Sequence, residues 1–438
     1  MSSTIPISAD LINQITRQAG IPSPGKASIR EIVHLVNLLQ KETGISFIRM
    51  EMGVPGLETP EIATRAETEA IKNGVASIYP PIEGVQLLKK ETSRFLKLFL
   101  NIDVNPAGCI PTCGSMQGSF AGFLTVNRTD RNREGTLFID PGFPVHKQQC
   151  HVLGHDFHSF DIYDFRGPRL RDKLKSILDT GKISSILYSN PNNPSWICLN
   201  EEELSIIGEL ANTYDVVILE DLAYFGMDFR TDISTPGKPP YQPTVAHYTD
   251  NYIILFSASK IFSYAGQRIA MMAVSDKLYN RRYPDLLRYF NSDVLGYTII
   301  YGSLYALSAG APHSAQIALG TLLREVNDGH FNPFVPIREY AERAAQMKQL
   351  FTRFGFKIVY DKDLDVPVGD GFYFTISRPG FSGPELLDEL IRYGISAITL
   401  NITGSTRTEG LRACVSQFRP EQLPDLEARL KRFDEDHK

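Results

Sequence analysis

Apolar and polar positions alternate with two different periods along most of the chain. Helix-like stretches, in which apolar residues recur every three or four positions, are followed by short continuous apolar runs. The helix-like stretches at 171–182 and 201–215 precede apolar runs at 184–190 and 216–221, and a third run spans 251–257. Helices that alternate with buried strands are typical of βαβ units. The pattern therefore predicts an α/β fold with a mostly parallel sheet before about residue 320.

The pattern changes after a helical stretch at 315–326. A loop at 328–339, rich in Pro, Asn and Gly, leads into a long helix at 338–355. Strand-like and helical stretches then follow in mixed order, with strands at 356–361, 371–377 and 395–400 and helices at 383–394 and 424–437. We expect three parts: an N-terminal segment that packs with the small domain (1–50), a large α/β domain (51–324) and a smaller α+β domain (325–438).

Composition narrows the possible classes of protein. The chain of 438 residues has 42% hydrophobic and 22% charged residues and a net charge of −5, which favours a soluble globular protein over one that binds nucleic acid or an anionic membrane. No apolar run approaches the length of a membrane-spanning helix, and the first residues lack the pattern of a secretory signal. The five scattered cysteines suit reduced thiols, so we expect a cytoplasmic protein.

The sequence contains two clusters of possible metal ligands, and neither supports a metal site. Cys109 and Cys113 have a spacing that suits zinc poorly, and no second pair matches them. His151, His155 and His158 would share one face only on a helix, which Gly154 makes doubtful. We therefore expect no metal.

Polar side chains gather where the predicted strands end. The strand ends carry DPGFP (140–144), NPNNPSW (190–196), EDLAY (220–224) and SASKIFSYAGQR (257–268). Ligands of open parallel sheets bind beyond the carboxyl ends of the strands. A lysine, an acid with a nearby tyrosine, asparagines and an aromatic ring would therefore meet at one edge. Such a set suits a cofactor with a carbonyl, a pyridine nitrogen, a phenolic oxygen and a phosphate.

These segments resemble the class I/II aminotransferases, which are fold type I enzymes that depend on pyridoxal 5'-phosphate (PLP). Three further segments match in the family's order: IYPPIEG (78–84), TCGSMQG (112–118) and GLRACVS (410–416). Each segment alone is a weak signal, but seven in order over most of the chain are a strong one. The resemblance implies the PLP-dependent transferase fold, whose large domain holds a seven-stranded sheet flanked by helices, and PLP as the cofactor.

The resemblance also implies roles around the cofactor ring. Lys260 would form the aldimine with the cofactor aldehyde and then act as general base and acid, which requires an amine that is neutral near pH 7. Asp221 would keep the pyridine nitrogen protonated. Tyr224 and Asn193 would both donate to the phenolic oxygen, and Phe143 would stack on the ring.

A second set of residues would hold the phosphate and the substrate. Ser257, Ser259 and Arg268 would donate to the phosphate, and Gly114, Ser115 and Met116 would present a helix N-terminus to it. Arg412 would bind the α-carboxylate of an amino acid, with Asn193 and Gly53 also near the substrate. Tyr79 is similar to the tyrosine that these enzymes send to the phosphate of a second subunit, which implies a homodimer.

We therefore expect an aminotransferase that moves an amino group between an α-amino acid and a 2-keto acid. A β-lyase, a decarboxylase or a synthase with the same cofactor remains the alternative, because the fold and cofactor set do not decide which bond at Cα breaks. A regulatory protein without turnover is disfavoured, since no basic helix-turn-helix pattern precedes the first motif. The side-chain specificity stays open. Arg407, Lys147 or an arginine from a partner could bind a second carboxylate, and Trp196, Phe225 and Tyr264 would suit an aromatic substrate.

Overall fold

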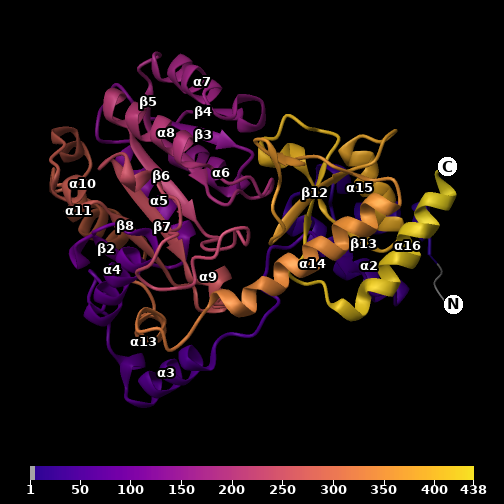
Figure 1. Ribbon diagram of the computed structural model, residues 1–438, viewed down its shortest axis with the longest axis horizontal. Coiled ribbons are helices and arrows are strands. Elements are labelled where there is room, and N and C mark those ends of the chain that lie inside the picture. The colour runs from indigo at the N-terminus through magenta and orange to yellow at the C-terminus, as the bar shows by residue number, and fades with distance from the viewer. Residues whose placement is uncertain (1–4) are drawn as a thin grey trace.

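A computed structural model describes residues 5–438, and its largest element is a seven-stranded sheet (Figure 1). The strand order is β2-β8-β7-β6-β5-β3-β4, and only β8 runs antiparallel to its neighbours. The strands are β2 (Cys109–Thr112), β3 (Gly135–Asp140), β4 (Phe157–Asp161), β5 (Ile183–Ser189), β6 (Val217–Leu222), β7 (Tyr252–Ser257) and β8 (Ala270–Val274). The prediction of a mostly parallel seven-stranded sheet is confirmed.

Helices cover both faces of this sheet, as its continuous apolar strands require. Neighbouring residues of β6 face opposite sides, since Ile218 and Leu219 belong to two separate apolar clusters. The helices of this part are α3 (Glu61–Lys72), α4 (Gln86–Leu100), α5 (Ser115–Val126), α6 (Pro144–Leu153), α7 (Arg169–Leu178), α8 (Glu201–Tyr214), α9 (Ala258–Ile261), α10 (Asp276–Asn280), α11 (Leu295–Tyr297), α12 (Tyr305–Ser308) and α13 (His313–Asn327).

The C-terminal residues form a smaller antiparallel sheet with the order β14-β15-β12-β9, together with three helices. Its strands are β9 (Lys357–Ile358), β12 (Tyr373–Ser377), β14 (Ile398–Thr399) and β15 (Leu411–Cys414). The helices are α14 (Phe334–Arg353), α15 (Gly383–Arg392) and α16 (Leu423–Asp436). The loop predicted at 328–339 is wrong in its second half, because α14 already begins at Phe334. Pro336 lies in the first turn of α14, where a helix tolerates proline.

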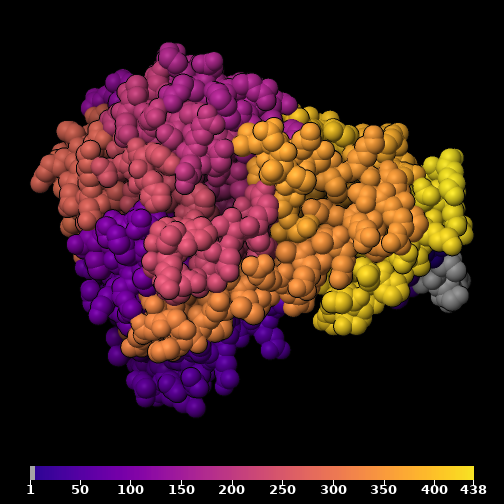
Figure 2. Space-filling view, in the orientation of Figure 1, coloured from indigo at the N-terminus to yellow at the C-terminus, as the bar shows by residue number. Residues whose placement is uncertain are grey.

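The N-terminal residues lie against this smaller sheet (Figure 1). β1 (Ile48–Arg49) pairs in parallel with β13 (Ile395–Ser396), and the N–H of Gly25 donates to Asp388 of α15 at 3.1 Å. The helices of the segment are α1 (Ala9–Gln18) and α2 (Ile29–Thr43), joined by the short helix η1 (Pro24–Lys26). Figure 2 shows the orange and yellow C-terminal residues as a lobe in contact with the magenta part of the chain.

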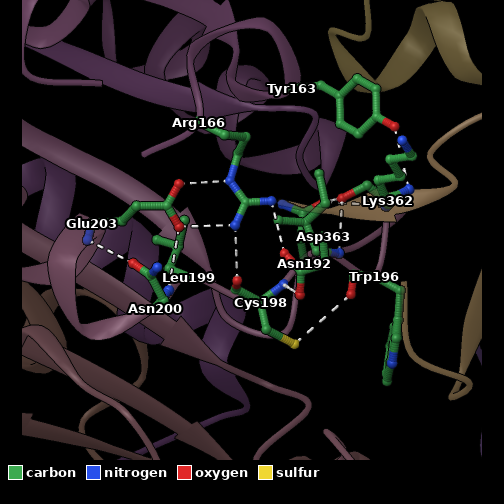
Figure 3. Close-up of polar contacts among 12 residues, drawn as sticks. Tyr163, Arg166, Asn192, Trp196, Cys198, Leu199, Asn200, Glu203, Lys362 and Asp363 are labelled. Carbon is green, nitrogen blue, oxygen red and sulfur yellow. Dashed lines mark hydrogen bonds and ion pairs between the residues drawn. The ribbon is translucent and has the colours of Figure 1, made fainter. Parts of the chain in front are cut away.

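A buried ion network joins the part of the chain around the large sheet to a hairpin of the C-terminal residues (Figure 3). Arg166, which follows β4, donates to Glu203 of α8 at 2.6 Å and to Asp363 at 2.8 Å. Asp363 lies in the hairpin formed by β10 (Lys362–Asp363) and β11 (Val366–Pro367), and it also accepts from Arg230 at 2.7 Å. Because each charge has an opposite partner, the network can stay buried between the large sheet and the hairpin.

Candidate active site

A cavity of about 690 Å³ lies at the carboxyl ends of β5, β6 and β7, where the residues of both sheets meet. The sequence-predicted site residues that line it are Gly53, Ser115, Met116, Phe143, Asn193, Asp221, Tyr224, Ser257, Ser259, Lys260, Arg268 and Arg412. Of the predicted set, Gly114 and Tyr79 do not line this cavity. Residues far apart in the sequence are thus brought together at the sheet edge that the strand pattern indicated.

Lys260 lies in α9, directly after β7, so the end of a buried strand fixes its position. Its Nζ donates to the carbonyl oxygen of Gly53 and lies 5.3 Å from the centre of the Phe372 ring. Burial lowers the pKa of the Lys260 amine to about 8, and the nearby charges of Arg412 and Arg268 act in the same direction. A substantial fraction of this amine is therefore neutral and nucleophilic at neutral to mildly alkaline pH.

Asp221 lies near the end of β6, the neighbour of β7. Its carboxylate accepts from the N–H of Ala223 at 3.1 Å, and the Nε2 atom of His146 is 4.0 Å away. Burial raises the pKa of Asp221 to about 7 and lowers the pKa of His146 to about 4, so His146 is neutral above that pH. Among residues 5–438, Asp221 has no cationic partner that would offset the cost of burying its charge.

His146 is a site residue that the sequence interpretation missed. It lies on α6, three residues after Phe143, and it is buried against the Asp221 side of the cavity. Its place two residues after the motif DPGFP (140–144) was the signal that could have identified it, since Phe143 and Pro144 had already been assigned to the strand end.

Gly114 lies directly behind Arg268, which lines another end of the cavity. Gly114 has a φ of 74°, and a Cβ atom there would lie only 2.4 Å from Nη2 of Arg268. Ser115 begins α5 directly after it, as the sequence predicted. Ser257, Ser259 and Arg268 line the same cavity, and the hydroxyl oxygen of Ser257 accepts from the N–H of Ser259 at 3.2 Å. Hydroxyls, a guanidinium group and a helix start therefore share one region, which suits an anion.

Arg412 reaches the cavity from β15 of the smaller sheet. It is buried, donates to the carbonyl oxygen of Glu51 at 2.6 Å and to Oδ1 of Asn193 at 3.3 Å, and lies 4.6 Å from the centre of the Tyr373 ring. The Tyr373 and Tyr224 hydroxyls are 2.8 Å apart. Nε of Arg412 has no hydrogen-bond partner among the described residues, so this buried cation retains donor capacity for an anionic ligand.

Three aromatic residues considered for substrate contact do not line the cavity. Trp196 is fully buried behind the site, where its ring packs edge-on against Tyr224 and Tyr373. Phe225 and Tyr264 are also buried in the core. These three residues therefore do not form the aromatic lining considered from the sequence, which could not show on which side of Tyr224 the indole lies.

The first turns of α2 form a further wall that sequence reasoning missed. Its members line the cavity and come from η1 and α2: Lys26, Ser28, Ile29, Arg30, Glu31 and Val33. In the sequence, Ile29 and Val33 belong to an amphipathic stripe of the kind that usually faces a core. Nothing local distinguishes a stripe that faces a cavity from one that faces a core.

The described residues offer neither a cluster of metal ligands nor a membrane-spanning helix. Within residues 5–438, no three His, Cys, Asp or Glu side chains lie close enough together to hold a metal ion. Over the same range, no helix is both long and apolar enough to cross a membrane.

The family model for aminotransferase class I and II matches residues 46–430. The chain belongs to this family. A probable aspartate aminotransferase of Methanocaldococcus jannaschii is 27% identical over 58% of this chain and 61% of its own length. An LL-diaminopimelate aminotransferase of Natranaerobius thermophilus is 27% identical over 56% of this chain and 62% of its own. The chain thus spans about six-tenths of the length of these curated relatives.

Solved structures of the family share the fold. An aminotransferase from Mycobacterium tuberculosis has a TM-score of 0.75 at 17% identity and covers 95% of this chain and 97% of its own. A double mutant of the Thermus thermophilus aspartate aminotransferase has a TM-score of 0.74 at 16% identity, with 96% and 98% covered. The fold class inferred from the sequence, an α/β domain plus a smaller α+β part, is confirmed.

Proposed function

We propose that this class I/II family member is a PLP-dependent aminotransferase, which moves an amino group between an α-amino acid and a 2-keto acid. The observation that carries the proposal is the placement of the Lys260 amine, the Asp221 carboxylate and the Arg412 guanidinium group in one cavity. A nucleophilic amine, an acid for a ring nitrogen and a cation for a carboxylate are the groups that this chemistry needs.

The residues present fit PLP. Asp221 is buried without a cationic partner among residues 5–438, and a protonated pyridine nitrogen would supply one. The lack of a Cβ atom at Gly114 leaves room beside Arg268, where Ser257 and Ser259 provide hydroxyls for a phosphate. Phe143 lines the cavity between these ends and offers a ring for stacking. When bound, PLP supplies an electrophilic aldehyde and a ring that takes up the electron pair of a broken Cα–H bond.

The chain's own residues then bind, orient and move a proton. Arg412 holds the α-carboxylate of the substrate through its guanidinium fork, which fixes the Cα–H bond relative to the ring. Lys260, whose pKa is lowered to about 8, takes the proton from Cα and returns it as general base and acid. Tyr224 and Asn193, which line the cavity, would hold the phenolic oxygen of the cofactor. His146 keeps water from the Asp221 side.

We also propose that two copies of the chain share their active sites, with Tyr79 reaching the phosphate of the partner. Tyr79 is 92% exposed and Ile78 is 59% exposed. The nearby Glu83 accepts from Tyr301, and Tyr297 and Tyr305 are also exposed. An apolar and aromatic surface of this kind favours contact with another protein surface.

We also propose that the chain has three parts and that it lies in the cytoplasm. The division into residues 1–50, 51–324 and 325–438 is supported by the pairing of β1 with β13 and by the separate sheets. The cysteines among the described residues are all free, which suits a reducing compartment such as the cytoplasm.

A panel of amino donors tests the proposed function. PLP-loaded protein is mixed with single amino acids, and absorbance follows the conversion of the aldehyde form of the cofactor to the amine form, with the keto acid measured in parallel. The proposal predicts stoichiometric amine form and keto acid from at least one donor, and none from Lys260→Ala. Release of ammonia or CO2 in place of the amine form would instead establish a lyase or a decarboxylase.

A further inference from the structure

Two tyrosine side chains that line the cavity are bonded to each other through their hydroxyls. Tyr224 follows β6 of the large sheet, and Tyr373 begins β12 of the smaller one. Their hydroxyl oxygens are 2.8 Å apart, and within residues 5–438 neither hydroxyl makes another hydrogen bond. Burial raises the pKa of both phenols, so each keeps its proton. One of the two protons therefore lies between the oxygens, and the other can be donated to a ligand.

The contact of Tyr224 with the cofactor decides which hydroxyl donates to the other. A phenol can hold an oxygen that carries negative charge only by donating its single O–H. If Tyr224 holds the phenolic oxygen of PLP, its own oxygen accepts from Tyr373. The backbone of Gly53 lies close against the Tyr373 hydroxyl, because a Cβ atom there would be 2.0 Å from its oxygen. A hydroxyl that accepts a hydrogen bond is also a stronger donor, so the pair strengthens the contact with the cofactor.

Trp196 packs against both tyrosines from behind the cavity. It lies in the turn that follows β5, where its N–H donates to the carbonyl oxygen of Asn192 at 3.0 Å (Figure 3). The centre of its ring lies 5.5 Å from that of Tyr224 and 6.2 Å from that of Tyr373, and the two tyrosine rings are 5.4 Å apart. All three rings meet edge to face, a geometry that aromatic pairs favour. The indole thus limits the movement of both phenols.

The conformation of Trp196 is costly for the chain. Its φ of 64° lies in the left-handed region, which an aromatic residue rarely adopts. Its Nε1 atom is buried and has no hydrogen-bond partner among the described residues. The ring fits only beside a glycine, because a Cβ atom at Gly371 would lie 2.1 Å from Cε2 of the indole. Costs of this kind persist where the surrounding structure requires the residue in that place.

We propose that Tyr373 is a positioning residue for the cofactor, which acts by donating its hydroxyl proton to the oxygen of Tyr224 while Trp196 holds the two rings in place. The single proton of Tyr224 is then directed to the phenolic oxygen of PLP. This inference rests on the proposed function and deepens it at the same site. Donation to the phenolic oxygen stabilises negative charge there, which lowers the proton affinity of the nitrogen that joins Lys260 to PLP.

A pH titration of the absorbance of bound PLP measures this proton affinity without turnover. Tyr373→Phe keeps the ring and removes only the hydroxyl, so it is expected to raise the midpoint of the titration by about half a pH unit, as the loss of one hydrogen bond would give. In a Tyr224→Phe background the same substitution should cause no shift, because Tyr373 acts only through Tyr224. Tyr393→Phe, which removes a buried hydroxyl bonded to Asp436, is the matched control and should keep the wild-type midpoint.

Trp196→Phe tests the support of the two rings. The smaller ring loses part of the contact with both tyrosines, so we expect a shift of the midpoint in the same direction as that of Tyr373→Phe, but smaller. An unchanged midpoint in Trp196→Phe would show that the indole does not hold the pair.

The inference is overturned if Tyr373→Phe leaves the midpoint unchanged, or if it shifts the midpoint equally with and without the Tyr224 hydroxyl. The titration needs bound PLP but no substrate, so this inference and the proposed function fail separately. Conversion of amino donors with an unchanged midpoint would leave the aminotransferase standing without the hydroxyl pair. A shifted midpoint with no donor converted would support the hydroxyl pair in a protein that is not an aminotransferase.

Discussion

The guanidinium group of Arg412 and the side-chain amide of Asn193 meet between the two sheets, with Nη1 3.3 Å from Oδ1. Arg412 belongs to the small sheet and Asn193 follows β5 of the large one. Because both line the same cavity, any shift between the sheets changes the geometry of the site. The placement of the substrate therefore depends on how the two parts of the chain are held together.

Replacement of Arg412 by Lys keeps the positive charge but removes the fork of donors. We expect Arg412→Lys to raise KM for amino donors by ~10-fold or more, with a smaller change in the affinity for PLP, because a carboxylate loses its bidentate partner. Steady-state kinetics and PLP titration measure the two effects. Arg419→Lys, an exposed arginine of the same region, should behave as wild type. An unchanged KM in Arg412→Lys would show that the α-carboxylate is bound elsewhere.

The raised pKa of Asp221 gives the cofactor-free protein a defined pH dependence. The folded pKa of about 7 lies above the ordinary value of 3.8. The stability that the protonated Asp221 side chain contributes below pH ~4 is therefore lost as the pH rises towards 7, because this carboxyl group ionises at a lower pH in the unfolded state than in the folded state. Asp221→Asn lacks this group, so its stability relative to wild type should grow from pH 4 to 7 and stay constant above 7.

Denaturant unfolding of the cofactor-free proteins across pH 4–8 checks this expectation, with the exposed Asp156→Asn as the control. The same Asp221→Asn variant should lose transamination by ~100-fold or more, since the ring nitrogen loses its acidic partner. A variant that is less stable than wild type at pH 8 would contradict the assignment of an uncompensated buried carboxylate.

The network around Arg166 should be a major contact between the two parts. Asp363→Asn removes the carboxylate that bridges Arg166 and Arg230, while Glu203 and Asp228 still pair with them, and we expect the free energy of unfolding to fall by about 2 kcal/mol. Asp365→Asn, an exposed residue of the same hairpin, should change stability by less than ~0.5 kcal/mol. Equal effects of the two substitutions in urea unfolding would mean that the network contributes little.

Tyr79 permits a test of the shared active site. Tyr79→Ala and Lys260→Ala should each be strongly impaired as homodimers. Co-expression of the two differently tagged chains should restore about a quarter of wild-type activity, because mixed dimers contain one complete site. No recovery in the purified mixed species would show that Tyr79 acts within its own chain or not at all.

The sequence predicted the site where its signals are local. Lys260 comes just after the apolar run 251–257, and Asp221 ends the apolar run 216–221. Parallel strands bring these ends to one edge of the sheet. Ser115 could be placed at a helix start by its neighbour Gly114. The start of α14 was misplaced because Pro333 and Pro336 indicate a loop, although Pro333 is the N-cap of α14 and Pro336 lies in its first turn.

Long-range contacts account for what the sequence could not give. Lys26 and Arg30 reach the cavity because Ile48 pairs with Ile395 and Gly25 is held by Asp388, contacts that no local pattern encodes. For the same reason, the sequence could not show that Trp196 lies behind Tyr224 and outside the cavity lining. The position of α2 along the cavity and the edge-on packing of Trp196 against Tyr224 both depend on tertiary contacts, which a local sequence pattern does not show.

Covalent trapping of PLP on one lysine tests the central claim most directly. The protein is incubated with PLP between pH 6 and 10, reduced with borohydride and mapped by mass spectrometry. We predict a pyridoxyl adduct on Lys260 whose rate of formation rises with pH to a plateau above about 8, since the neutral amine reacts. Lys89 also has a pKa near 8, but its amine is buried and donates to three carbonyl oxygens, so it should stay unmodified. An adduct absent from Lys260, or spread evenly over surface lysines, would contradict the account.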